Sequence, residues 1–237
     1  MFCSRSLLVC NLITKLSRVI PLPCTYSLSR LYNFVSTPSR YWILLFVRDG
    51  AFLYDSVSSS WTNHRTLYSP DFLSTDKVFY KGAFFFIAWD VFKVVSFDVE
   101  EGEWKEHEWE LPSRLTFARL VTDGEEKLLL VGGIAIIVKN QIRNCVKVWE
   151  LSSEEGRWNE VETLPDECLG NHTGLSYHLQ CFWHQGMICF NFLWPEVFCF
   201  HVSRRSWHLI PRCPALQNKS SSALTWFSFC PQIAYSV

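Results

Sequence analysis

The chain has 237 residues and a formal net charge of −1, so it is long enough for one large unit or two small domains. This charge balance gives no electrostatic footprint for nucleic acid or an anionic membrane surface. Aromatic residues reach 16%, with eleven Trp and nineteen Phe, which favours β-sheets. The longest apolar run, Leu128–Val138, is too short for a membrane-spanning helix, which needs about 20 residues. We therefore expect no membrane span and no nucleic-acid partner.

The cysteines indicate a reducing compartment. Ten are present, without a C-x-x-C spacing, and several lie inside apolar runs: Cys145, Cys181, Cys189 and Cys199. We expect reduced thiols that act as small core residues, rather than disulfides or metal ligands, in a cytoplasmic or nuclear protein.

One pattern recurs along the chain: a short apolar strand ends in an aromatic and a polar residue, and a tryptophan follows. The aromatic residues and their tryptophans are Tyr54 and Trp61, Phe97 and Trp104, Trp149 and Trp158, and Phe200 and Trp207. The step is seven residues in three copies and nine in the copy with Trp149, and the tryptophans are 43, 54 and 49 residues apart. Self-similarity at this period, with only strand signals inside each unit, predicts an all-β propeller of repeated blades.

The N-terminus has two interpretations. The first 48 residues contain six Arg or Lys and no Asp or Glu, a composition typical of a transit peptide. However, the segment 9–23 aligns with the last copy: Cys10-Asn11 stands where Phe200-His201 stands, and Ser17 takes the tryptophan position. We favour a degenerate repeat that has lost its tryptophan.

These copies predict one propeller domain over residues 1–237 with about five four-stranded blades. The copies cover approximately 1–23 (partial), 31–66, 77–111, 115–164 and 179–211, with a closing segment at 223–237. The first copy holds only the last two strands of a blade. The segment Leu224–Val237 is a candidate for the missing inner strands, and it would close the ring and remove exposed strand edges. A longer parent protein could have six blades.

The repeat resembles the kelch motif, in which a strand ends in a double glycine and an aromatic-acidic pair and a tryptophan follow. The fourth copy has all these features, in Gly132-Gly133, Trp149-Glu150 and Trp158, whereas the other copies lack the double glycine. We expect the glycines to give a tight turn with positive φ, and each tryptophan to fill the wedge between neighbouring blades.

Two segments, Val9–Pro23 and Ala223–Val237, resemble the kelch domain of plant F-box/kelch-repeat proteins. In that family an N-terminal F-box docks on a Skp adaptor, and the propeller presents a protein substrate for ubiquitination. No F-box is visible in this chain: Leu164–Leu169 resembles the start of one, but polar residues follow instead of a helical apolar pattern. The resemblance thus implies a substrate-recognition module that is not itself an enzyme, with a Skp adaptor as partner only if an F-box lies upstream.

The chain shows no pattern typical of an active site. It has no G-x-S-x-G, P-loop or H-E-x-x-H motif, so we expect neither catalytic residues nor a cofactor. His172, His178 and His184 lie near Cys181, but a spacing of six residues is not a familiar ligand pattern, so we expect no metal site. The acidic run from Asp98 to Glu110 has two interpretations, a solvated outer strand or an interaction stripe for a basic partner.

Partner-binding residues of a propeller lie on loops at its rims. The candidates are residues 139–144, 166–176 and 217–222, and the sequence does not choose among them. The favoured function is therefore a protein-interaction module of the F-box type. One alternative is a stand-alone kelch scaffold unrelated to ubiquitin. Another is a propeller oxidase with copper bound by Tyr and His, for which Tyr80, Tyr177 and His178 are available without a supporting spacing.

Overall fold

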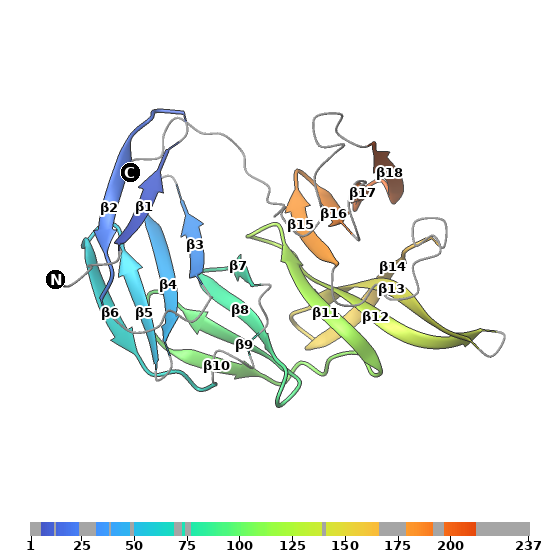
Figure 1. The fold of residues 1–237 in the computed structure, drawn as a ribbon. Coiled ribbons are helices and arrows are strands. Elements are labelled where there is room, and N and C mark those ends of the chain that lie inside the picture. The colour runs from blue at the N-terminus through green and yellow to red at the C-terminus, as the bar shows by residue number, and fades with distance from the viewer. Residues whose placement is uncertain are drawn as a thin grey trace.

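The computed structural model describes residues 6–11, 13–23, 32–37, 39–47, 50–68, 73, 77–138, 141–165, 179–191 and 197–211. All regular elements in these ranges are β-strands, eighteen in number, arranged in five antiparallel sheets. The sheets follow one another along an arc in chain order (Figure 1). Within the described part of the chain there is no helix of the length and apolarity needed to cross a membrane.

Each sheet corresponds to one predicted blade. Blade 1 has two strands, β1 (Ser6–Cys10) and β2 (Ser17–Pro21). Blade 2 contains β3 (Tyr32–Ser36), β4 (Tyr41–Val47), β5 (Gly50–Asp55) and β6 (Ser60–His64). Blade 3 contains β7 (Val78–Tyr80), β8 (Ala83–Ala88), β9 (Lys93–Asp98) and β10 (Trp104–His107).

Blade 4 contains β11 (Leu115–Thr122), β12 (Leu128–Val138), β13 (Gln141–Ser152) and β14 (Arg157–Thr163). Blade 5 contains β15 (Gln180–His184), β16 (Met187–Asn191), β17 (Val197–His201) and β18 (Ser206–Ile210). The prediction of an all-β propeller is confirmed, with four four-stranded blades and one two-stranded blade. The predicted completion of blade 1 by Leu224–Val237 lies outside the described residues.

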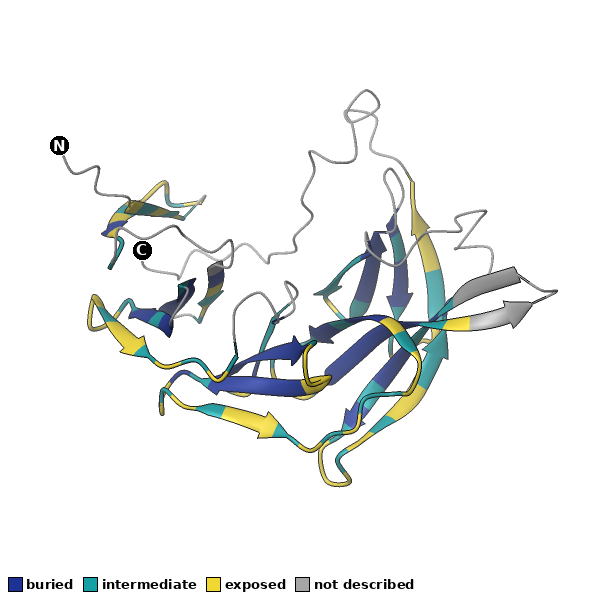
Figure 2. Ribbon diagram, turned by 60° about the horizontal axis from the view of Figure 1, so that its bottom comes forward, coloured by how far each residue is buried: buried dark blue, intermediate teal, exposed yellow. Residues whose placement is uncertain are grey.

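The core lies between the blades, because each middle strand contributes buried side chains to clusters on both of its faces. Strand β8 shows this best: Phe84 and Phe86 pack into a cluster shared with blade 2, and Phe85 and Ile87 into one shared with blade 4. Successive side chains of a strand point to opposite faces, so a strand between two neighbours must be apolar throughout. Figure 2 shows these strands as buried and parts of the outer strands as exposed. The first strand of blade 4, β11, contacts both β7 and β15, as expected for inner strands around a shared axis.

A recurring turn joins the third and fourth strands of each blade. The residue two positions before the tryptophan position has a positive φ in all five blades: Lys15 (62°), Ser59 (55°), Gly102 (69°), Gly156 (64°) and Arg205 (48°). The polar residue that begins the turn caps it: Asn11 Oδ1 accepts hydrogen bonds from two backbone N–H groups of its own turn, at 2.9 and 3.1 Å, and Asp98 Oδ1 does the same at 2.8 and 3.0 Å. Cys10 pairs with Ser17 as Tyr54 pairs with Trp61, so the first copy is a repeat in the expected register.

The double glycine departs from the prediction. Gly132 and Gly133 lie inside β12, which continues to Val138 and forms a long hairpin with β13 (Figure 1), and neither glycine has a positive φ. A Cβ atom on Gly133 would lie 2.3 Å from Phe117 Cε1, and one on Gly132 would lie 2.5 Å from Leu115 Cδ2. The glycines are therefore required by close side-chain packing across β12, not by a turn.

Candidate functional site

The repeat positions form cross-strand pairs that lie between blades. Trp61, Trp104 and Trp207 each face the aromatic residue seven positions earlier, with ring centroids 5.2, 5.1 and 4.9 Å apart. Each tryptophan also packs against the cluster shared with the preceding blade. Trp104, for example, lies 5.9 Å from Phe46 of blade 2. These residues occupy packing positions between blades.

One repeat position was assigned to the wrong residue. Trp149 was expected to be the equivalent of Tyr54, but it pairs with Glu160, and Leu151 is the residue opposite Trp158. The step from Leu151 to Trp158 is seven residues, as in the other blades, so the nine-residue spacing arises from a leucine at the aromatic position. Trp149 is instead buried in the cluster between blades 3 and 4.

The two rims of the propeller differ in their connections. Strand directions alternate within each blade, so the first-to-second and third-to-fourth turns lie at one rim, which we call the turn rim. The second-to-third connections and the links between blades lie at the other, the loop rim. All turn-rim connections are short, whereas the loop rim carries every long connector. Of the predicted binding segments, residues 141–144 lie in β13 beside a loop-rim connection, whereas residues 139–140, 166–176 and 217–222 lie outside the described ranges.

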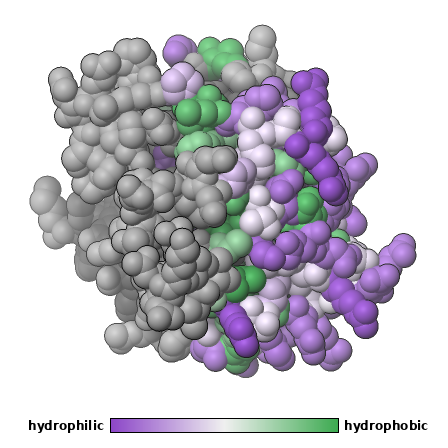
Figure 3. All heavy atoms as spheres, turned by 90° about the vertical axis from the view of Figure 1, so that its right-hand side faces the viewer, coloured by the Kyte–Doolittle hydropathy of each residue, from purple (hydrophilic) through white to green (hydrophobic). Residues whose placement is uncertain are grey.

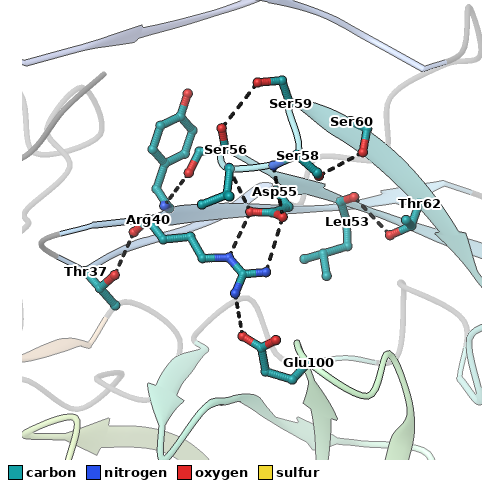
Figure 4. A network of polar contacts seen from close by, with 12 residues as sticks. Thr37, Arg40, Leu53, Asp55, Ser56, Ser58, Ser59, Ser60, Thr62 and Glu100 are labelled. Atoms are coloured by element: carbon teal, nitrogen blue, oxygen red, sulfur yellow. Dashed lines mark hydrogen bonds and ion pairs between the residues drawn. The ribbon is translucent and has the colours of Figure 1, made fainter.

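A polar network closes the turn rim between blades 2 and 3 (Figure 4). Arg40 Nε donates to Asp55 Oδ1 at 2.9 Å, and Arg40 Nη1 donates to Glu100 Oε1 at 2.7 Å. The guanidinium lies 4.6 Å from the centre of the Trp42 ring. Burial disfavours ionised Asp55, but the hydrogen bonds from Arg40 and from the backbone N–H groups of its turn outweigh this effect and lower the pKa of Asp55. A pocket of about 190 Å³ adjoins the network, whose charges are already paired with one another.

Three carboxylates of the acidic run, those of Asp98, Glu100 and Glu106, are engaged within the molecule. Strand β10 covers Trp104–His107, a shorter span than the charged run. Glu106 accepts a hydrogen bond from the Tyr68 hydroxyl and pairs with Lys93 Nζ at 3.0 Å, and both contacts lower its pKa. Burial and the hydrogen bond to this carboxylate raise the pKa of Tyr68 to about 12. These contacts link the end of blade 2 to the base of the β8–β9 connection in blade 3.

The candidate metal ligands do not assemble in the described residues. His184 lies in β15, while His172, Tyr177 and His178 lie outside the described ranges. No group of three or more His, Cys, Asp or Glu side chains suited to a metal is found in the described part of the chain. The Tyr80 hydroxyl donates to the Glu126 carbonyl at 3.1 Å, so it is already hydrogen-bonded.

The buried thiols of blade 5 form a pair that the spacing did not indicate. Cys189 and Cys199 face each other across β16 and β17, with their Sγ atoms 3.2 Å apart. The contact with Cys199, together with burial, raises the pKa of Cys189, so this thiol stays protonated.

A four-residue connection in blade 3 was also missed by the sequence analysis. Residues Trp89–Phe92, which we call the aromatic turn, join β8 to β9 at the loop rim. Val91 and Phe92 are 45% and 38% exposed. The signal was present in the sequence, since Asp90 is the one residue of W-D-V-F that belongs to the types that usually form turns. Elsewhere, on the side of the molecule turned to the viewer in Figure 3, the described surface is mainly hydrophilic with scattered hydrophobic patches.

Comparison with known proteins supports this architecture. A family model described as the KIB1-4 beta-propeller matches residues 2–187. An F-box/kelch-repeat protein of Arabidopsis thaliana is 38% identical over 98% of this chain and 62% of its own length. F-box only protein 6 of Arabidopsis thaliana is 27% identical over 88% of this chain and 47% of its own length. The chain thus spans about half to two thirds of the length of these relatives.

Among solved structures, a Staphylococcus aureus virginiamycin B lyase with quinupristin aligns over 91% of this chain and 78% of its own, at 12% identity and a TM-score of 0.47. A streptogramin B lyase aligns over 81% and 72%, at 11% identity and a TM-score of 0.45. These values are too low to carry functional information. The family match covers most of the chain and agrees with the blade order and the predicted likeness to plant F-box/kelch proteins, so the chain belongs to the KIB1-4 beta-propeller family.

Proposed function

We propose that this chain is the partner-binding propeller of an F-box-type ubiquitin ligase receptor. In this role it selects a protein substrate and performs no chemistry itself, while a Skp adaptor contacts an F-box elsewhere in the receptor. The proposal places its action in the cytoplasm or nucleus.

The difference between the connections at the two rims is the observation that supports the proposal. Short capped turns and paired charges close the turn rim, whereas the loop rim carries the connectors that differ in length from blade to blade. Loops of variable length on a rigid scaffold are a common arrangement of binding surfaces. The likeness to F-box proteins, one of them a kelch-repeat protein, adds the link to ubiquitination by analogy.

The test compares the chain alone with the same chain fused behind an F-box. Both forms are tagged, expressed in plant cells and purified with their bound proteins, and the half-life of each bound protein is measured. We expect both forms to bind the same proteins, and only the fusion to recruit the Skp adaptor and shorten the half-life of a bound protein.

Two results would contradict the proposal. If bound proteins keep their half-life in the presence of the fusion, the stand-alone scaffold replaces the receptor. If the purified chain contains copper at one atom per molecule, the oxidase alternative replaces both.

A further inference from the structure

The aromatic turn exposes apolar side chains at the loop rim, and packing and strand pairing hold its backbone in place. Val91 and Phe92 are exposed, while Trp89 packs against the cluster shared by blades 3 and 4. The rings of Trp89 and Phe92 lie 5.9 Å apart. The Ala88–Lys93 pair closes the turn at its base. The exposed residues are therefore held in place by a packed core, which limits the entropy lost when they contact a partner.

Phe92 occupies a backbone conformation that disfavours it. Its φ is 52°, in the left-handed region where a bulky side chain is strained. The other described non-glycine residues with positive φ are all polar: Lys15, Ser59, Lys81, Arg114, Gln185 and Arg205. A glycine would fit this position without strain. Because the Phe92 ring is partly exposed, its packing within the fold offsets only part of the free energy of this backbone strain. Strained backbone conformations of this kind are typical of functional positions.

The charge beside the exposed ring is negative. Asp90 Oδ1 accepts a hydrogen bond from Val91 N–H at 2.9 Å, and its carboxylate has no ion pair with any residue that the structure describes. The neighbouring Glu106 is already engaged by Lys93 and Tyr68. A partner that covers Val91 and Phe92 would therefore meet one available anion at the tip of the turn.

We propose that the aromatic turn anchors an extended peptide segment of the protein partner, with an apolar side chain against Val91 and Phe92 and a neighbouring Lys or Arg against Asp90. This inference rests on the proposed binding function and names the surface and the chemistry of the partner. Large side chains packed against a partner dominate binding hot spots, and complementary charges beside them add specificity.

The probe is a phage-displayed library of random 12-residue peptides, selected on the purified 237-residue chain. We expect the enriched peptides to carry an apolar residue within two positions of Lys or Arg. Their affinity, measured by fluorescence polarisation, should fall by about tenfold or more for V91S/F92G and by about threefold for D90N, because rim charges contribute less than buried anchors. The control L209S changes a residue of similar exposure (52%) on β18 and should bind as the wild type does.

A second measurement separates binding from folding. F92G removes the strained side chain, so it should unfold at a temperature no lower than the wild type while it loses peptide affinity. The inference is overturned if enriched peptides bind V91S/F92G as tightly as the wild type, if they lack the apolar-basic pattern, or if no peptide is enriched. The first two outcomes leave the receptor function intact, since that is decided by the half-life of bound proteins.

Discussion

Leu151 and Trp158 face each other across β13 and β14, at the positions that Tyr54 and Trp61 occupy across β5 and β6. The repeat is therefore defined by its turn and its tryptophan rather than by an aromatic residue at the end of the third strand. In each blade, the turn between the third and fourth strands ends in a residue with the left-handed conformation, and this turn fixes the register of the two strands. In blade 4 this register places Trp158 toward the preceding blade.

Truncation of a blade tryptophan should destabilise the fold strongly. Trp104 packs between blades 2 and 3, against Phe46, Phe86 and Phe97 at centroid distances of 5.9, 5.7 and 5.1 Å. Trp104→Ala should reduce the free energy of unfolding by about 3–5 kcal/mol, since it leaves a cavity between the blades. Urea denaturation checks this value. Val57→Ala, at a residue that is 68% exposed, is the control and should change stability by less than about 0.5 kcal/mol.

Glycine should be favoured at both of two equivalent turn positions, so removing it from one and introducing it at the other should change stability in opposite directions. Gly102 has a φ of 69°, and a Cβ atom there would lie 2.4 Å from His64 Cε1, so Gly102→Ala should destabilise the protein by more than about 1 kcal/mol. Arg205 occupies the same position in blade 5 with a φ of 48°, so Arg205→Gly should be neutral or stabilising by about 0.5 kcal/mol. Thermal unfolding of both variants measures the difference. A loss of stability in Arg205→Gly would show that its side chain contributes more than the backbone strain.

The role of the double glycine can be tested by making room for a side chain. Gly133→Ala should destabilise the protein by about 1–3 kcal/mol because its Cβ would meet the Phe117 ring. In a Phe117→Leu background the same substitution should cost clearly less. If the penalty is equal in both backgrounds, the glycine is needed for its backbone and the packing explanation fails. Chemical denaturation of the four proteins completes the cycle.

The fold could be predicted from local patterns because the blade repeats them. The sequence shows the apolar middle strands and the periodic tryptophans. It also shows the two-residue turns Lys81-Gly82 and Gln185-Gly186, and in the structure every residue of these turns has a positive φ. The register of blade 4 was not visible, because Leu151 carries no aromatic signal. The glycines were misread because their constraint comes from Phe117 and Leu115, on a neighbouring strand.

The candidate site was less predictable than the fold. Loop positions follow from strand order, so the sequence could place the candidate connectors between strands. It could not show at which rim a connector lies, since this depends on strand direction. The strain at Phe92 depends on a dihedral angle, and the pairing of Arg40 with Glu100 joins residues sixty positions apart.

The two ion pairs of Arg40, with Asp55 and with Glu100, should contribute unequally to the stability of the junction between blades 2 and 3. Arg40 and Asp55 have side chains that are 28% and 20% exposed, whereas Glu100 is 63% exposed. A double-mutant cycle with Arg40→Met and Asp55→Asn should give a coupling energy of about 1 kcal/mol, and a cycle with Glu100→Gln about 0.3 kcal/mol. Added salt should reduce the second value more than the first, because exposed pairs are better screened. Equal coupling energies would contradict this ranking.

His107 should make the protein sensitive to mild acid. Its ring packs against Phe85 and Trp109, at centroid distances of 5.2 and 3.9 Å, and burial, followed by the charge of Lys105, lowers its pKa to about 4. Between pH 6.5 and 4 the unfolded chain binds a proton that the folded chain does not, so stability falls as the pH falls through this window, by up to about 3 kcal/mol. Urea denaturation at pH 7.5, 5.5 and 4.5 should show a shallower pH dependence for His107→Phe than for the wild type. Ser96→Ala removes the hydrogen bond to the ring but leaves it buried, so it should keep the wild-type slope. If Ser96→Ala flattens the profile as His107→Phe does, the hydrogen bond and not burial lowers the pKa of His107.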